Sequence, residues 1–192
     1  MSLKIAVLGT GANGSCIAAS LIDAGRDVTL IDQWPAHVEA MRTNGLKITM
    51  PDREQHVKVR AHHLCDVCTF REPFDVALIA VKAYDTRWAC EMIKPHLAEN
   101  GMVIGMQNGM VADVIREVIG PARSIACVIE LSSEMFTPGL VKRNTPPQKT
   151  WMGLGALDGN NGARLASLRD GAPVRLRACR ARSRSFAAAC CA

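Results

Sequence analysis

The fold is decided by residues 3–32, LKIAVLGTGANGSCIAASLIDAGRDVTLID. They open with an almost continuous apolar run, Leu3–Leu8, which is typical of a strand buried on both faces of a parallel sheet. A glycine-rich turn at 9–14 follows, and after it come apolar residues at helical spacing up to Gly25. A second β-branched run occupies Asp27–Ile31. The order of strand, glycine turn, helix and strand predicts a βαβ unit.

The turn contains the pattern GxGxxG, formed by Gly9, Gly11 and Gly14. In dinucleotide-binding domains these glycines allow a tight turn, a close approach of the backbone to a pyrophosphate, and close packing of helix on strand. The following helix offers free backbone N–H groups and a partial positive charge to that anion. We therefore predict that the cofactor is held by the whole loop, namely Gly9, Thr10, Gly11, Ala12, Asn13 and Gly14. The alternative is an ordinary glycine turn.

Asp32 ends the second predicted strand, eighteen residues beyond Gly14, where an acidic residue completes the dinucleotide fingerprint. A carboxylate there can accept hydrogen bonds from ribose hydroxyls, whereas a 2′-phosphate would meet a like charge and needs a nearby cation. The first cation after Asp32 is Arg42. This residue therefore favours NAD over NADP. The alternative is that Asp32 is an ordinary loop acid.

The rest of the chain continues to alternate between strands and helices, which predicts the α/β class with a doubly wound, mostly parallel Rossmann sheet. The expected helices are 35–44, 85–94 and 111–119, and the expected buried strands are 74–82, 102–106 and 124–129. The segments 46–50 and 56–60 flank a polar turn and predict a short hairpin. The segments 139–143 and 149–155 predict an antiparallel edge that finishes the sheet.

Composition limits the possible surroundings and partners of the protein. Residues 1–158 carry 16 basic and 17 acidic side chains, whereas 159–192 carry seven arginines and a single aspartate. The folded part is thus nearly neutral, and we expect no nucleic-acid partner. No apolar run approaches the length of a membrane span, so we expect no membrane partner. Eight cysteines without a signal peptide favour a cytoplasmic location.

Two polar residues follow predicted buried strands, at the sheet edge where ligands bind in such folds. Lys82 comes just after the strand in VALIAVK, and Asn108 follows the strand in MVIGMQ. Each has a simpler interpretation, because Lys82 could be a solvated loop lysine and Asn108 could belong to a turn with Gly109.

Four features of the sequence occur in a characteristic order and spacing: KIAVLGTGANG, the lysine of AVKAYDT, the asparagine of QNGM and the segment PGLV. Through them the chain resembles, over about residues 3–158, the N-terminal domain of the ketopantoate reductase (2-dehydropantoate 2-reductase) family. The resemblance implies that Lys82 contacts the cofactor and that Asn108 helps to place the nicotinamide and the substrate. The implied reaction is reduction of a 2-oxo acid, ketopantoate to pantoate in pantothenate biosynthesis. The family normally uses NADPH, from which Asp32 departs.

Family resemblance also implies what is missing. The proton donor of the family is a lysine in a helical C-terminal domain, within a pattern like RxxxWxKLxxN, and full-length members often form homodimers through that domain. The last lysine of this chain is Lys149, so we identify no catalytic residue and expect a truncated enzyme. A catalytically silent NAD(P)-binding module and another two-domain hydroxyacid or polyol dehydrogenase are the alternatives.

We accordingly assign 1–158 to a dinucleotide-binding domain and regard 159–192 as a tail rather than a domain. The tail is rich in arginine, alanine and cysteine, the residues that GC-rich DNA yields when it is read out of frame. Our hypothesis is that residues from about 165 onward are a frameshifted or otherwise aberrant end, and the alternative is an intrinsic arginine-rich tail.

The segment HHLCDVC, with His62, His63, Cys65 and Cys68, superficially resembles a set of metal ligands. A structural zinc site needs a second ligand pair farther along, and none follows at a suitable distance. A redox-active CxxC is also disfavoured, because the pair is not predicted to open a helix after a strand. We expect no metal site, and we expect three other cysteines to fill the core, Cys16, Cys90 and Cys127. His37 and His96 are expected to be solvated on helices.

The hypothesis of a frameshifted end makes a prediction about the underlying DNA. Translation of the other reading frames downstream of about codon 165 is expected to yield a string resembling WxKLxxN, because a frameshift hides the second domain without deleting it. Absence of such a string from those frames would rule the hypothesis out.

Overall fold

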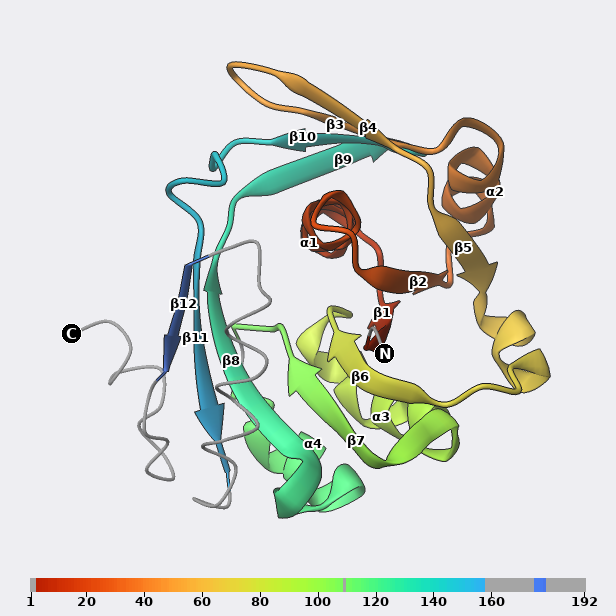
Figure 1. Cartoon of the computed structure of the whole chain (residues 1–192), viewed down its shortest axis with the longest axis vertical. Helices are drawn as coiled ribbons and strands as arrows, with labels where there is room; N and C mark the ends of the chain where they lie inside the picture. Colours follow the sequence, from red (N-terminus) through yellow and green to blue (C-terminus); the bar gives the residue numbers. More distant parts are fainter. Residues whose placement is uncertain (1–2, 109, 158–174, 179–192) are drawn as a thin grey trace.

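A computed structural model of the chain describes residues 3–108, 110–157 and 175–178, and its centre is an eight-stranded sheet (Figure 1). The strand order is β12-β11-β8-β7-β6-β1-β2-β5. These strands are β1 (Lys4–Leu8), β2 (Asp27–Asp32), β5 (Arg60–His63), β6 (Phe74–Ile79), β7 (Leu97–Gly105), β8 (Ser124–Glu130), β11 (Trp151–Ala156) and β12 (Arg175–Ala178).

The six strands from β5 to β8 run parallel, and β11 pairs antiparallel with β8. The predicted class, a mostly parallel sheet with an antiparallel edge, is therefore confirmed. The strand β12 pairs with β11 and lies inside the segment predicted to be a tail. The sequence also suggests a helical turn at 163–168, which lies outside the described residues. Because the chain leaves β1 toward β2 on one side and later returns to β6 on the other, a crevice forms at the carboxyl ends of β1 and β6.

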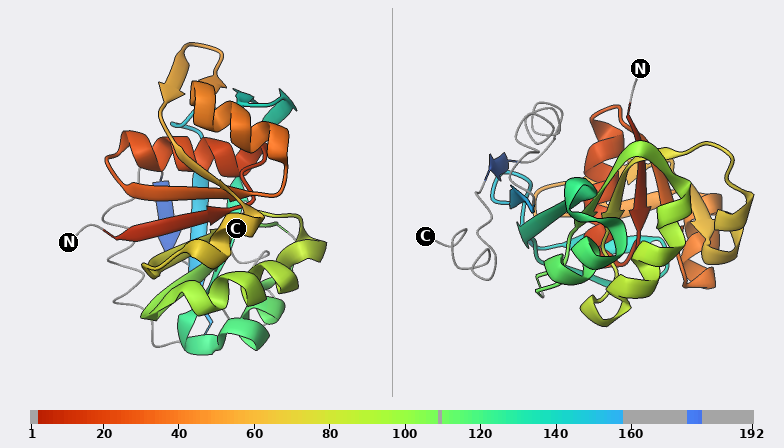
Figure 2. Two further views of the ribbon diagram at one scale, coloured as in Figure 1. Left: turned by 90° about the vertical axis from the view of Figure 1, so that its right-hand side faces the viewer. Right: turned by 90° about the horizontal axis from the view of Figure 1, so that it is seen from below.

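Helices cover both faces of the sheet (Figures 1 and 2). One face carries α1 (Ala12–Asp23) and α2 (Pro35–Asn44), and the opposite face carries α3 (Thr86–Ile93) and α4 (Ala112–Ile119). Short 3₁₀ helices are η1 (Leu64–Thr69), η2 (Ala83–Asp85), η3 (Lys94–His96) and η4 (Pro121–Arg123). Among the described residues, no helix is both long and apolar enough to cross a membrane.

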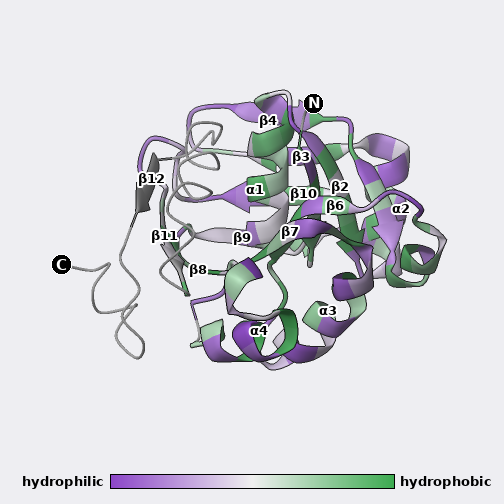
Figure 3. Cartoon of the chain, turned by 60° about the horizontal axis from the view of Figure 1, so that its bottom comes forward, coloured by the Kyte–Doolittle hydropathy of each residue, from purple (hydrophilic) through white to green (hydrophobic). Residues whose placement is uncertain are grey.

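The alternation of side chains along β1 explains its continuous apolar run. Ile5 and Val7 belong to the core cluster that includes α1, whereas Ala6 and Leu8 belong to the cluster that includes α3 and α4. In Figure 3 the helices α3 and α4 carry both hydrophobic and hydrophilic colours, as helices with one buried and one solvent-facing side do. The predicted buried strand is thus confirmed by its packing on both faces.

A second sheet, with strand order β4-β3-β10-β9, packs over α1 and was not predicted. Its strands are β3 (Leu46–Thr49), β4 (Glu54–Val57), β9 (Ser133–Thr137) and β10 (Leu140–Arg143). The hairpin of β3 and β4 was expected, but the assignment of 139–143 to the edge of the main sheet is wrong, because β10 pairs with β3 and β9.

The helix between the two sheets is built from small residues. The buried positions of α1 are Gly14, Ser15, Cys16, Ile17, Ala18 and Ala19. A helix packed on both sides cannot carry large side chains without pushing the sheets apart, so this composition suits a sandwiched helix. The second sheet therefore covers a face of α1 that would otherwise be exposed.

The end of the predicted hairpin also differs from expectation. The segment 56–60 was expected to be one strand, but β4 ends at Val57 and β5 begins at Arg60, where it pairs in parallel with β2. Alternation of apolar and polar residues marks extended chain, but it does not show where a strand passes from one sheet to another.

The packing of α1 on the glycine turn makes Gly14 a sensitive position. A methyl group at Gly14 would lie 2.1 Å from the carbonyl oxygen of Gly9, so backbone would have to move. We expect Gly14→Ala to lower the free energy of unfolding, measured by urea denaturation, by about 1–3 kcal/mol. Gly11→Ala is the matched control, since a methyl group there meets nothing within 4 Å. Equal stability of Gly14→Ala and the wild type would contradict this packing.

Candidate cofactor site

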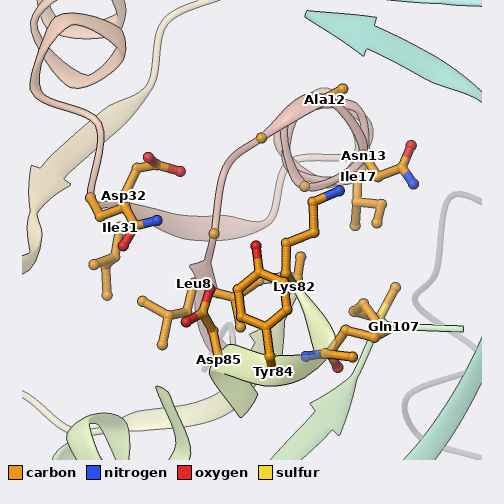
Figure 4. Close-up of a pocket in the computed structure, with 18 of the residues that line it drawn as sticks. Leu8, Ala12, Asn13, Ile17, Ile31, Asp32, Lys82, Tyr84, Asp85 and Gln107 are labelled. Atoms are coloured by element: carbon orange, nitrogen blue, oxygen red, sulfur yellow. The ribbon is translucent and has the colours of Figure 1, made fainter. Parts of the chain in front are cut away.

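A cavity of about 650 Å³ lies at the carboxyl ends of β1, β2, β6 and β7 (Figure 4). Its wall brings together the predicted site residues Gly9, Gly11, Ala12, Asn13, Gly14, Asp32, Lys82 and Asn108. Apolar side chains complete the wall, among them Leu64, Val81 and Trp88. In Figure 4, Asp32 and Gln107 lie on opposite sides of the cavity, with Tyr84 and Lys82 between them. The cavity is thus lined by both apolar and polar groups, as small-molecule and cofactor sites are.

The three glycines of the motif occupy different environments. Gly9 has a φ of +89°, and a Cβ atom there would lie 2.6 Å from the backbone nitrogen of Val81. Gly14 packs directly against the carbonyl of Gly9. Gly11 borders the cavity, and a Cβ atom there would meet nothing within 4 Å, so a ligand can approach its backbone. The first turn of α1 lies beside it with backbone N–H groups that lack partners within the helix.

Asp32 is 8% exposed and ties the end of β2 to the glycine loop. Its Oδ2 accepts hydrogen bonds from the backbone N–H of Thr10 at 2.6 Å and from the hydroxyl of Thr10 at 3.1 Å. Its Oδ1 accepts the backbone N–H of Trp34 at 2.8 Å. An ionised carboxylate offers about four lone-pair sites. Asp32 therefore fixes the loop and still has about one acceptor position for a ligand hydroxyl.

Thr10 differs from the rest of the loop because it is not among the described residues that line the cavity. It has no exposed surface. Its carbonyl oxygen accepts the hydroxyl of Ser15 at 2.6 Å and lies 2.8 Å from Nε2 of His37. Thr10 therefore anchors the loop, and its neighbours face the cavity.

Lys82 follows β6 and is exposed at the cavity mouth. Figure 4 shows its side chain extending toward the side of the cavity formed by the glycine loop. Among the described residues, no carboxylate lies within salt-bridge distance of its ammonium group. Lys82 thus places a positive charge on the side of the cavity that the glycine loop forms.

Asn108 lines the cavity, but its amide is already engaged by the main chain of β8. Its Nδ2 donates to the carbonyl of Ile129 at 3.0 Å, and its Oδ1 accepts the N–H of Ile129 at 3.2 Å. This pair of bonds holds the segment after β7 against β8. The simple turn interpretation from sequence missed this contact, because the two residues are 21 positions apart.

Gln107, next to it, was not predicted as a site residue. Its Nε2 donates to the hydroxyl of Thr86 at 2.9 Å, while its buried Oε1 has no hydrogen-bond partner among the described residues. Unpaired buried acceptors are rare in folded proteins. Asn13 shows a second contact that was not predicted, because its Oδ1 accepts the hydroxyl of Ser133 at 2.5 Å from β9. Neither residue carries a sequence signal for these contacts.

The other candidates from the sequence lie away from the site chemistry. No cluster of three or more metal-ligating side chains occurs among the described residues. Cys65 and Cys68 are exposed on η1, which directly follows β5, so the expectation that they do not open a helix after a strand is wrong. Cys16 and Cys90 are buried fillers, as predicted, and burial raises the pKa of Cys16 to about 11 and that of Cys90 to about 12.

The two histidines expected on helix surfaces behave differently. His96, on η3, is partly exposed and packs edge-on against Phe70. His37, on α2, is fully buried, so the prediction that it is solvated is wrong. Its imidazole is covered by the glycine loop and by the turn between β9 and β10. Helix periodicity could not show this, because the covering segment comes from the second sheet.

The glycine loop, the helix end and the carboxylate of Asp32 meet at the switch point of a parallel sheet, which defines the class of NAD(P)-binding Rossmann domains. The family model for the ketopantoate reductase PanE/ApbA matches residues 5–157. The chain belongs to this family of NAD(P)-dependent oxidoreductases.

Individual relatives agree with the family match. A 2-dehydropantoate 2-reductase of Mesorhizobium japonicum is 30% identical over 161 residues, which cover 73% of this chain and 48% of that protein. The crystal structure of a PanE/ApbA family ketopantoate reductase from Ralstonia eutropha JMP134 has a TM-score of 0.78 at 30% identity, covering 92% of this chain and 56% of that one.

A third similar structure is the ternary complex of D-mandelate dehydrogenase with NADH and anilino(oxo)acetate. It has a TM-score of 0.85 at 21% identity and covers 97% of this chain and 59% of that one, which shows a shared fold. The chain spans about half the length of the curated relatives that it matches.

The clamp between Asn108 and Ile129 can be tested by a substitution that keeps the shape of the side chain. In Asn108→Asp an ionised oxygen replaces the donor that faces the Ile129 carbonyl, so two acceptors oppose each other. We expect the free energy of unfolding at pH 7 to fall by about 1–3 kcal/mol in urea denaturation. Asn108→Ala, which removes both bonds without adding charge, is expected to lose less. A urea midpoint unchanged in Asn108→Asp would show that the clamp contributes nothing.

Proposed function

We propose that this chain is the cofactor-binding half of a 2-oxo acid reductase and that it holds NAD(P)H in the cavity at the end of the main sheet. One observation carries the proposal. The glycine loop, Asp32 and Lys82 come from separate parts of the sequence and line a single cavity. Open space at Gly11 and the free end of α1 suit a pyrophosphate.

Each part of the cavity has a role in this proposal. The backbone amides of the glycine loop bind the pyrophosphate, and Lys82 adds a positive charge beside it. Asp32 accepts a ribose hydroxyl at its remaining lone pair, which orients the adenosine half. Asn108, held by β8, fixes the wall at the far end, where the nicotinamide and the substrate would meet. A bound reduced nicotinamide supplies a hydride to the ketone carbon of the substrate.

The substrate class in this proposal is a small 2-oxo acid, with ketopantoate as the specific candidate. It rests on family membership and on relatives described as 2-dehydropantoate 2-reductases. Hydride arrival on a ketone leaves an alkoxide that must receive a proton from a positioned acid. The proposal assigns this role to none of the described cavity residues, so the chain supplies a half-site. A homodimer of the full-length protein and a cytoplasmic location stay predictions.

Between the two dinucleotides, the proposal favours NADH. The carboxylate of Asp32 would repel a 2′-phosphate. The first cation after Asp32 in sequence, Arg42, is already engaged, since it contacts Glu39, Asp66 and the carbonyl of Ala61. A related fold is known with NADH bound, in D-mandelate dehydrogenase. The preference in this chain therefore depends on Asp32 and departs from the family norm of NADPH.

Calorimetric titration of the purified 192-residue chain with NADH and with NADPH tests the proposal. NADH is expected to bind, and to bind more tightly than NADPH. Lys82→Ala is expected to weaken NADH binding roughly tenfold or more, because a charged contact to a phosphate is lost. Lys94→Ala, an exposed lysine outside the cavity, is the matched control. Tighter binding of NADPH would contradict the role of Asp32, and absence of binding would contradict the proposed function.

The same preparation separates an enzyme from a silent module. Oxidation of NADH in the presence of ketopantoate is followed by absorbance, with Lys82→Ala as the comparison. Turnover well above that of Lys82→Ala would exclude the silent module for this chain. Binding of NADH without turnover would support it.

A further inference from the structure

His37 is a polar side chain that is fully buried although it does not line the cavity. It lies in the first turn of α2 and has no exposed surface. Its Nε2 is 2.8 Å from the carbonyl oxygen of Thr10, and its Nδ1 accepts the backbone N–H of Gly139 at 2.9 Å. Those two partners belong to the glycine loop and to the turn between β9 and β10. One imidazole therefore joins three segments that are far apart in sequence.

The hydrogen bonds decide which nitrogen of His37 carries the proton. A backbone N–H can only donate, so Nδ1 must be the unprotonated acceptor for Gly139. Nε2 then carries the hydrogen and donates it to the carbonyl of Thr10. The hydroxyl of Ser15 donates to the same oxygen at 2.6 Å. Both lone pairs of the Thr10 carbonyl are thus used, and the imidazole is neutral.

Orientation of the Thr10 carbonyl determines the orientation of an amide that faces the cavity. The carbonyl of Thr10 and the N–H of Gly11 belong to one planar, trans peptide, so they point in opposite directions. Since His37 and Ser15 hold the carbonyl inward, the N–H of Gly11 must point outward. The peptide before it is fixed in the same way, because Asp32 binds the N–H of Thr10.

We propose that His37 is a positioning residue, which sets the Gly11 amide toward the dinucleotide by joining the glycine loop to the turn between β9 and β10. This inference rests on the proposed function, because the amide matters only if a dinucleotide binds there. His37 does not line the cavity and would not touch the ligand. The β9–β10 hairpin supports the loop at a second point, through the bond of Ser133 to Asn13.

Protonation of His37 would break this arrangement, because Nδ1 would then present an N–H to the N–H of Gly139. Burial lowers the pKa of His37 below its usual value of 6.5, while the nearby carboxylate of Asp32 acts in the opposite direction. The unfolded chain therefore binds the proton more readily than the folded chain does. The stabilisation is complete above about pH 6.5 and is lost as the pH falls below that value toward the folded pKa.

Two substitutions separate the two hydrogen bonds. In His37→Gln the amide nitrogen can take the place of Nε2 and keep the bond to the Thr10 carbonyl. In His37→Asn the amide oxygen can take the place of Nδ1 and keep the bond from Gly139, while the donor to Thr10 is lost. His56→Gln, at an exposed histidine of β4, is the matched control.

The experiment measures NADH affinity and thermal stability of these variants between pH 5 and pH 8. His37→Asn is expected to bind NADH roughly three- to tenfold more weakly at pH 7.5, while His37→Gln stays within about twofold of the wild type. The wild type is expected to bind NADH more weakly as the pH falls from 6.5 toward the lowered pKa of His37, and this weakening is expected to be absent in His37→Gln. Nitrogen-15 NMR of the wild-type imidazole, which requires no cofactor, is expected to show the neutral form protonated at Nε2.

The possible results distinguish a failure of this inference from a failure of the proposed function. If the wild type binds NADH and His37→Asn binds equally well, His37 has no positioning role and the inference fails alone. If both substitutions weaken binding only in proportion to lost stability, His37 is merely structural and the inference also fails. A proton on Nδ1 in the NMR spectrum would overturn it without reference to NADH. If the wild type binds no dinucleotide, the proposed function fails and the inference with it.

Discussion

The peptide groups on either side of Thr10 are the constraint on which the site depends. The N–H of Thr10 is held by Asp32, and its carbonyl is held by Ser15 and His37. The preceding N–H, that of Gly9, donates to the carbonyl of Ile31 at 2.9 Å. Because each peptide is planar, fixing one polar group of a unit fixes the other. The loop therefore has its amide directions set before any ligand arrives, which reduces the entropy lost on binding.

The second sheet helps to hold the peptide groups around Thr10 in place. It packs over α1, the helix whose first turn faces the cavity, and its β9–β10 turn supplies the N–H that orients His37. The small residues of α1 allow two sheets to approach one helix. The loop is thus held by β2, through Asp32, and by the β9–β10 hairpin, through Ser133. A glycine-rich segment thus becomes a fixed binding element partly through a contact with a strand that follows it by 120 residues.

The features that could be predicted from the sequence were those that local sequence patterns indicate. Apolar runs located β1 and β6, glycine spacing located the loop, and the position of Asp32 at the end of β2 connected them. The contacts that were not predicted are non-local ones. His37 meets Gly139 across 102 positions, and Asn13 meets Ser133 across 120. Helical periodicity treats a histidine on α2 as solvated, because it carries no information about a covering turn from a distant strand.

We propose above all that the backbone amides of the glycine loop bind the pyrophosphate of a dinucleotide. Its most direct test is an NMR titration of the nitrogen-15 labelled chain with NADH, following the backbone amide signals. We expect saturable shifts that are largest at Gly11, Ala12 and Asn13, with little change in the second sheet. A titration that leaves these three amides unshifted while NADH binds elsewhere would contradict it.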